Sequence, residues 1–157
     1  MARTDTASKA IQAPPHAVYA AFVDPAALLQ WLPPKGMAGA LDAFEPTPGG
    51  RFWMTLTYSD DHATRGKTSE HSDVVRGEFV ELIPDRRIVQ RLRFESADPS
   101  FAGTMTMIWE LNPDILGTFV SVTCEDVPEG ISAEDHAKGL NSSLENLAAY
   151  CESGDGA

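Results

Sequence analysis

The feature that most constrains the fold is a single long amphipathic segment at the C-terminal end of the chain. Within it, positions on one face recur at intervals of four, four, three and four residues: His136, Leu140, Leu144, Leu147 and Cys151. This spacing predicts a helix of about five turns. Ser132, followed by Asp135, resembles a capping box and marks its beginning. Gly139 costs about 1 kcal/mol relative to alanine, so we expect another part of the chain to pack closely against it.

Six extended segments precede this helix. Apolar and polar residues alternate in most of them, and short turns rich in proline, glycine, asparagine and aspartate separate most of them. The expected strands are Met37–Pro46, Arg51–Tyr58, Asp73–Ile83, Arg87–Glu95, Gly103–Leu111 and Gly117–Glu125. Ser59–Ser72 is polar and is expected to be a long mobile hairpin loop. Short turns between consecutive strands predict an antiparallel meander.

The chain opens with a short strand and two short helices. The strand is expected at about Ser8–Ala13, and prolines favour helices at Pro15–Val23 and Pro25–Trp31. The predicted class is therefore α+β, with a seven-stranded curved antiparallel sheet wrapped around the long C-terminal helix. We expect residues 1–157 to form one domain. One helix does not fill the hollow of such a sheet, so a cavity between them is expected.

Composition and charge exclude several classes of function. The 157 residues are 43% hydrophobic and carry a formal net charge of −11. This charge disfavours nucleic acid and acidic lipid as partners. No apolar run is long enough to insert into a membrane, and no signal peptide is evident, so we expect a cytosolic protein. Cys124 and Cys151 are expected to behave as small hydrophobic residues.

Several motifs, in order, resemble one protein family. Segments of this chain are similar to the opening, glycine turn, central hairpin, last strand and final helix of Hsp90-ATPase-activator-homologue-like proteins, in the START-like (SRPBCC, helix-grip) superfamily. The matching segments are Ile11–Pro25, Pro48–Phe52, Gly77–Ile88, Gly117–Thr118 and His136–Leu147. The resemblance covers about residues 8–152.

The resemblance implies a helix-grip fold with a pocket. The family commonly carries a tryptophan where this chain has Leu140, which removes a large ring from the expected pocket wall. The eukaryotic activator also uses a basic motif with asparagine and tryptophan that is not found in this sequence. The resemblance therefore carries over a fold and a pocket, and it carries over no activity.

The candidate ligand pocket is rich in methionine and aromatic side chains, which suit an adaptable apolar site. Its expected members are Trp31, Phe44, Phe52, Met54, Phe79, Glu81, Leu92, Phe94, Met105, Met107, Trp109, His136, Leu140 and Leu144. Glu81 alternates with Phe79 and is expected to face inward, where it would pair with an arginine such as Arg91 or contact a ligand. His136 is either a hydrogen-bonded imidazole at the pocket, a polar ligand anchor or a general acid–base.

Three functions follow from these residues. The first is a cytosolic protein that binds a small hydrophobic or amphipathic molecule under the C-terminal helix. The second is a cyclase-like or hydratase-like enzyme with His136 and Glu81 as proton-transfer groups. The third is a chaperone-associated module that activates an ATPase. The sequence leaves a homodimer and a chaperone partner open, and it predicts no metal site and no cofactor, since metal-ligand and nucleotide-binding spacings are not evident.

Overall fold

The computed structural model describes residues 3–34, 36–58 and 72–152. Within these ranges the chain forms a strand, two short helices, six further strands and a long final helix, with one 3₁₀ turn between strands. The elements are β1 (Arg3–Ile11), α1 (Pro15–Val23), α2 (Pro25–Trp31), β2 (Met37–Phe44), β3 (Arg51–Tyr58), β4 (Ser72–Ile83), β5 (Arg87–Phe94), η1 (Pro99–Phe101), β6 (Met105–Asp114), β7 (Gly117–Val127) and α3 (Ala133–Glu152). The predicted α+β helix-grip class is confirmed.

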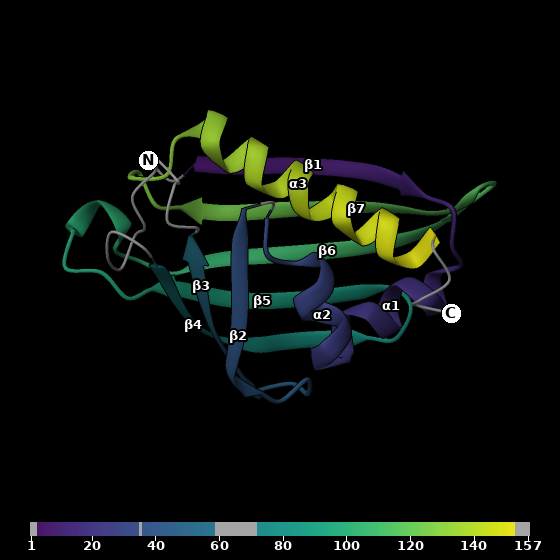
Figure 1. Ribbon diagram of the computed structural model, residues 1–157, viewed down its shortest axis with the longest axis horizontal. Coiled ribbons are helices and arrows are strands. Elements are labelled where there is room, and N and C mark those ends of the chain that lie inside the picture. Colours follow the sequence, from purple (N-terminus) through teal and green to yellow (C-terminus); the bar gives the residue numbers. More distant parts are fainter. Residues whose placement is uncertain (1–2, 35, 59–71, 153–157) are drawn as a thin grey trace.

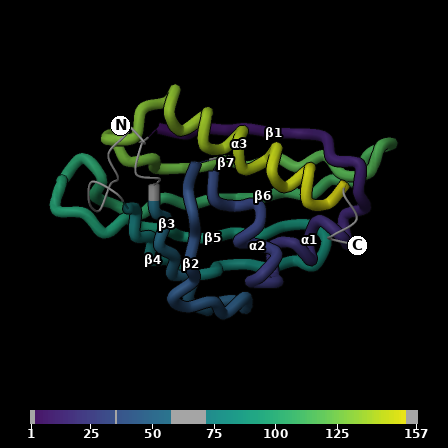
Figure 2. Tube along the Cα trace, viewed as in Figure 1, coloured from purple at the N-terminus to yellow at the C-terminus, as the bar shows by residue number. Residues whose placement is uncertain are grey.

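The strands form one antiparallel sheet in the order β1-β7-β6-β5-β4-β3-β2. Strands β2 to β7 pair with their neighbours in sequence, while β1 pairs with β7. In Figure 1, β2 and β3 run across the direction of β6 and β7, so the sheet curves. Helix α3 crosses the concave side close to β1, and α1 and α2 lie toward its C-terminal end (Figures 1 and 2).

Two local features help the sheet to curve. The ladder shifts register at Leu41/Ala43 in β2 and at Phe79/Glu81 in β4, and such bulges bend a strand. Gly77 of β4 lies opposite Leu92 of β5, and a Cβ added to Gly77 would collide with the carbonyl oxygen of Arg91. A glycine inside a strand marks such a close approach of neighbouring backbone.

Helix α3 is positioned by its cap and by its apolar stripe. The Ser132 hydroxyl accepts a hydrogen bond from the Asp135 backbone N–H at 3.0 Å, as the capping motif predicts. The side chains of Leu140, Leu144 and Leu147 are buried against the sheet. The expectation that another segment packs against Gly139 is wrong, because a Cβ added there meets no atom within 4 Å.

The C-terminal half of α3 covers a tightly packed aromatic cluster, called here the packed end. Phe22, Trp31 and Trp109 meet edge to face, with ring centroids 4.8 to 5.7 Å apart. The Trp31 indole N–H donates to the carbonyl of Ala21 at 2.9 Å, which satisfies its polar group in the core. The Ser143 hydroxyl of α3 donates to the carbonyl just after α2, at Leu32, over 2.7 Å.

One predicted element has a different beginning in the structure, and the predicted loop lies mostly outside the described residues. β1 begins at Arg3, five residues before the predicted start, because its first half alternates polar residues and carries no apolar signal. The predicted loop falls on residues 59–71, outside the described residues, while Ser72 belongs to β4. Within the described part of the chain, no helix combines the length and apolar character needed to span a membrane.

Candidate functional site

A pocket of about 560 Å³ lies between the concave face and the N-terminal half of α3. Its floor comes from β3, β4, β5 and β6, and its roof includes Asp135–Ser143. The lining residues are mostly apolar: Leu32, Pro34, Met37, Phe52, Met54, Leu56, Asp73, Val75, Gln90, Leu92, Phe94, Phe101, Met105, Met107, Trp109, Gly130, Ile131, Asp135, His136, Lys138, Gly139, Leu140, Ser142 and Ser143. Both size and lining are typical of small-molecule sites.

The structure brings most of the predicted site residues to this pocket. Those that line it are Phe52, Met54, Leu92, Phe94, Met105, Met107, Trp109, His136 and Leu140. Trp31 instead belongs to the packed end, and Leu144 is buried in the core without lining the pocket. Phe44 and Phe79 form an aromatic triangle with Phe52, at centroid distances of 5.7 to 6.1 Å, and do not line the pocket. Contact between any of these residues and a ligand stays a prediction.

Glu81 does not face inward, contrary to the expectation. Phe79 is opposite Gln90 on β5, but Glu81 is opposite Val89, because a bulge inserts one residue between them. The bulge reverses the alternation and places Glu81 on the outer face, with its side chain 46% exposed. Its carboxylate pairs with Arg87 at 3.1 Å, and not with Arg91 as predicted.

This correction removes the proposed enzyme mechanism. Proton transfer by His136 and Glu81 requires both side chains to reach one void, and general acid–base groups act within hydrogen-bond distance of the reacting atoms. His136 lines the pocket, whereas Glu81 lies on the opposite side of the sheet. A cyclase-like or hydratase-like reaction that uses this pair is therefore excluded.

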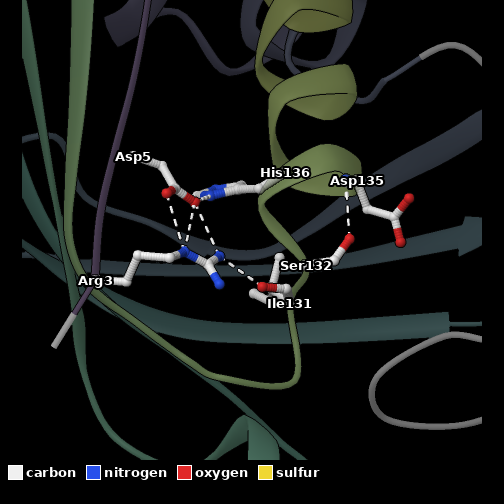
Figure 3. A network of polar contacts seen from close by, with 6 residues as sticks. All are labelled: Arg3, Asp5, Ile131, Ser132, Asp135 and His136. Carbon is white, nitrogen blue, oxygen red and sulfur yellow. Dashed lines mark hydrogen bonds and ion pairs between the residues drawn. The ribbon is translucent and has the colours of Figure 1, made fainter. Parts of the chain in front are cut away.

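His136 belongs to a network that joins the beginning of α3 to the beginning of β1 (Figure 3). Its Nδ1 lies 2.6 Å from Asp5 Oδ2, and their side chains are 11% and 14% exposed. Arg3 donates from Nε and Nη2 to the same carboxylate, and also from Nη2 to the carbonyl oxygen of Ile131. Because an ionised carboxylate only accepts, Nδ1 carries the hydrogen of this contact.

The electrostatics of this network favour an ionised Asp5. Burial alone would raise the pKa of the Asp5 carboxyl, but hydrogen bonds from Arg3 and His136 and their positive charges outweigh burial and lower the pKa. An ionised Asp5 holds the imidazole in one orientation. Of the alternatives for His136, the structure shows the hydrogen-bonded imidazole at the pocket, and Asp5 is its partner.

Sequence reasoning missed three polar residues at this site, Arg3, Asp5 and Gln90. Arg3 and Asp5 precede the predicted first strand, and no apolar alternation points to them. Gln90 carried a signal, since it shares the phase of Ile88 and Leu92 on β5 and so faces the same side. A polar residue in an apolar phase of a central strand indicates a functional position.

The two cysteine thiols do not offer a second reactive site. Burial raises the pKa of the Cys124 thiol to about 12, with a further contribution from the negative charge of Asp5, and burial raises that of Cys151 to about 11. Thiols with such pKa values are poor nucleophiles. Among residues 3–34, 36–58 and 72–152, no three histidine, cysteine, aspartate or glutamate side chains are arranged to hold a metal ion.

Comparison with known families identifies the chain. Residues 12–152 match the family described as activator of Hsp90 ATPase homolog 1-like protein. The chain belongs to this family. The family lies within the START-like superfamily, and membership supports a ligand-binding domain at a coarse level. No curated protein matches the chain.

Solved structures agree with this assignment. A protein from Chromobacterium violaceum is 31% identical, with a TM-score of 0.84 over 95% of this chain and 96% of its own. A protein from Aeromonas hydrophila that is like the same activator family is 17% identical, with a TM-score of 0.73 over 99% and 96%. A protein from Mycobacterium smegmatis is 17% identical, with a TM-score of 0.69 over 94% and 88%. The last two likenesses are of fold alone.

Proposed function

We propose that this chain binds a small hydrophobic or amphipathic molecule in the pocket under α3. The observation that carries the proposal is the pocket itself, which has a volume of about 560 Å³ and a largely apolar wall. Specific small-molecule sites have volumes of about 300–1,000 Å³ and combine apolar walls with a few polar groups. Met54, Met105 and Met107 add unbranched side chains that adapt to the shape of a ligand.

Gly139 offers a direct way to test the proposal. It lies one turn from His136 and from Ser143, which also line the pocket, and a side chain added there has open space. A Gly139→Phe variant would fill part of the pocket without a clash at Cβ. Ala137→Phe is the matched control, because Ala137 is exposed on the same helix.

The measurement is saturable binding of the neutral dye Nile red, followed by its fluorescence. The wild type and Ala137→Phe should bind the dye with similar affinity, and Gly139→Phe should lose at least tenfold. Circular dichroism checks that both variants retain the fold. Equal binding by Gly139→Phe and Ala137→Phe would place the dye elsewhere, and no binding by the wild type would count against the proposal.

The family description supports a second candidate, a module that stimulates the ATPase of an Hsp90-type chaperone. This role requires an outer surface and does not require the pocket. The purified chain should then raise the ATPase rate of the chaperone from the same organism, and Gly139→Phe should raise it equally. An unchanged rate at saturating protein would reject this candidate.

A further inference from the structure

Gln90 is a buried polar side chain in the floor of the pocket. It lies on β5, the middle strand of the seven, and its residue is 7% exposed. It lines the pocket, and no hydrogen bond reaches its side-chain amide within the described part of the chain. Other buried polar groups of the pocket differ: Ser143 donates to Leu32, and His136 is held by Asp5.

The surroundings of Gln90 are apolar. Its partners across the neighbouring strands are Phe79 and Met107, and Ile88 and Leu92 flank it on the same face of β5. Burying an unpaired amide costs free energy, and a leucine or methionine would occupy this position without that cost. The amide therefore needs a hydrogen-bond partner that enters the pocket, either water or part of a ligand.

We propose that the ligand is an uncharged molecule with an apolar body and a hydroxyl or carbonyl group that hydrogen-bonds to the amide of Gln90. This inference rests on the proposed function. The amide offers both an acceptor oxygen and a donor NH₂, so it suits a hydroxyl as well as a carbonyl. Because one buried polar group lies among apolar neighbours, Gln90 would fix the orientation of the ligand.

The charges around the pocket disfavour an anionic ligand. Asp135 lines the pocket, Asp5 and Glu134 lie next to the lining residues His136 and Lys138, and the chain has a formal net charge of −11. Among the described lining residues, the Lys138 ammonium group lies 3.4 Å from Glu134 with its side chain 72% exposed, and the His136 imidazole is paired with Asp5 at 2.6 Å. A ligand carboxylate would lose water and meet acidic neighbours. The neutral alcohol or ketone of the same shape avoids both costs.

Three probes of one ring system separate these chemistries: naphthol, methylnaphthalene and naphthoate. Isothermal titration at neutral pH should give naphthol an affinity at least tenfold above that of methylnaphthalene, because only naphthol completes the hydrogen bond of the amide. Naphthoate should bind more weakly than naphthol. In wild-type protein labelled with ¹⁵N, naphthol should shift the side-chain NH₂ signal of Gln90 more than methylnaphthalene does.

The variant Gln90→Met removes the amide and keeps an unbranched side chain. It should lower the affinity for naphthol about tenfold, leave methylnaphthalene unchanged and keep or raise the melting temperature of the ligand-free protein. If Gln90 were needed only for structure, Gln90→Met would lower the melting temperature instead. Gln30→Met is the control, because Gln30 is exposed on α2. The NMR comparison remains decisive if Gln90→Met does not fold.

The outcomes separate this inference from the proposed function. If naphthol and methylnaphthalene bind the wild type equally and neither shifts the Gln90 signal, the inference is wrong while the pocket still binds ligand. If naphthoate binds tightest, the preference for an uncharged ligand is wrong. If none of the probes binds, and Nile red does not bind either, the proposed function itself fails.

Discussion

The two halves of α3 meet the same sheet in different ways. The C-terminal half carries the fully buried Leu144 and Leu147 and lies next to α1 and α2, which contribute Phe22 and Trp31 to the packed end. The N-terminal half, Asp135–Ser143, covers the pocket. One helix on one curved sheet therefore produces both a solid core and a cavity.

The difference originates in where α1 and α2 lie. They occupy the space at one end of the concave face, next to the C-terminal half of α3, and not at the other end (Figure 1). A curved sheet with a single helix leaves more room than side chains alone fill. The short helices thus decide which part of the hollow becomes core and which remains available to a ligand.

The largest loss of stability should come from truncating a buried side chain in the C-terminal half of α3. Leu144→Ala should lower the free energy of unfolding by about 3 kcal/mol, because it opens a void in a close-packed core. Leu140→Ala, one turn earlier, should cost about half as much, since Leu140 already borders the pocket. Urea unfolding of both variants measures the contrast. Equal losses would show that the two halves of α3 are packed alike.

The network of Arg3, Asp5 and His136 should give the next largest effect. Asp5→Asn should lower the free energy of unfolding by about 2 kcal/mol at pH 7. The reason is that a neutral amide takes the place of the carboxylate that accepts charge-assisted hydrogen bonds from Arg3 and His136. The pKa of Asp5 is lowered in the folded state, so its contribution is complete above its unfolded pKa of about 4 and is lost as the pH falls through the lower folded pKa.

The measurement for this variant is urea unfolding across the acid range. The difference between wild type and Asp5→Asn should therefore shrink as the pH falls from about 4 toward 2. Glu129→Gln is the control, an exposed side chain that should change stability little at any pH. A difference that stays constant down to pH 2 would contradict the role assigned to the Asp5 charge.

Substitution of Gly139 in α3 and of Gly77 in β4 should change stability in opposite directions. Gly139→Ala should raise stability by up to about 1 kcal/mol, since alanine favours the helix and its methyl group has open space. Gly77→Ala in β4 should lower stability, because its Cβ collides with the Arg91 carbonyl. Thermal unfolding compares them. A loss of stability in Gly139→Ala would mean that the roof is packed after all.

The smallest effect is expected when the native protein is exposed to a reagent that labels thiols. Cys124 and Cys151 have pKa values of about 12 and 11, so at pH 8 about one thiol in a thousand or fewer is ionised. A disulfide reagent such as dithionitrobenzoate should not label the native protein within minutes and should label both thiols in urea. Rapid labelling of native protein would show that the core opens near one of them.

The architecture was predictable because it depends on repeated patterns. The leucine stripe of α3 and the alternation of β3, β5 and β6 extend over many residues, so single exceptions do not obscure them. The site depends instead on places where the chain departs from these repeated patterns. A bulge between Phe79 and Glu81 reverses which face Glu81 occupies, and a bulge leaves no reliable mark in the sequence.

The partners of His136 were unpredictable for a different reason. Asp5 and His136 are 131 positions apart, and the strand that carries Asp5 begins with polar residues that lack an apolar period. Their contact depends on β1 pairing with β7, which only the complete sheet establishes. Gln90 was within reach of sequence reasoning, since its phase along β5 was already known.

The pairing of β1 with β7 also has a consequence for synthesis on the ribosome. Among the described strands, β1 pairs only with β7, so it stays unpaired while about a hundred further residues are made. Such long-range pairing is typical of slow folding. Helix α3, which covers the pocket, follows β7 in the chain, so on the ribosome the pocket is completed only after all the described strands have been synthesised.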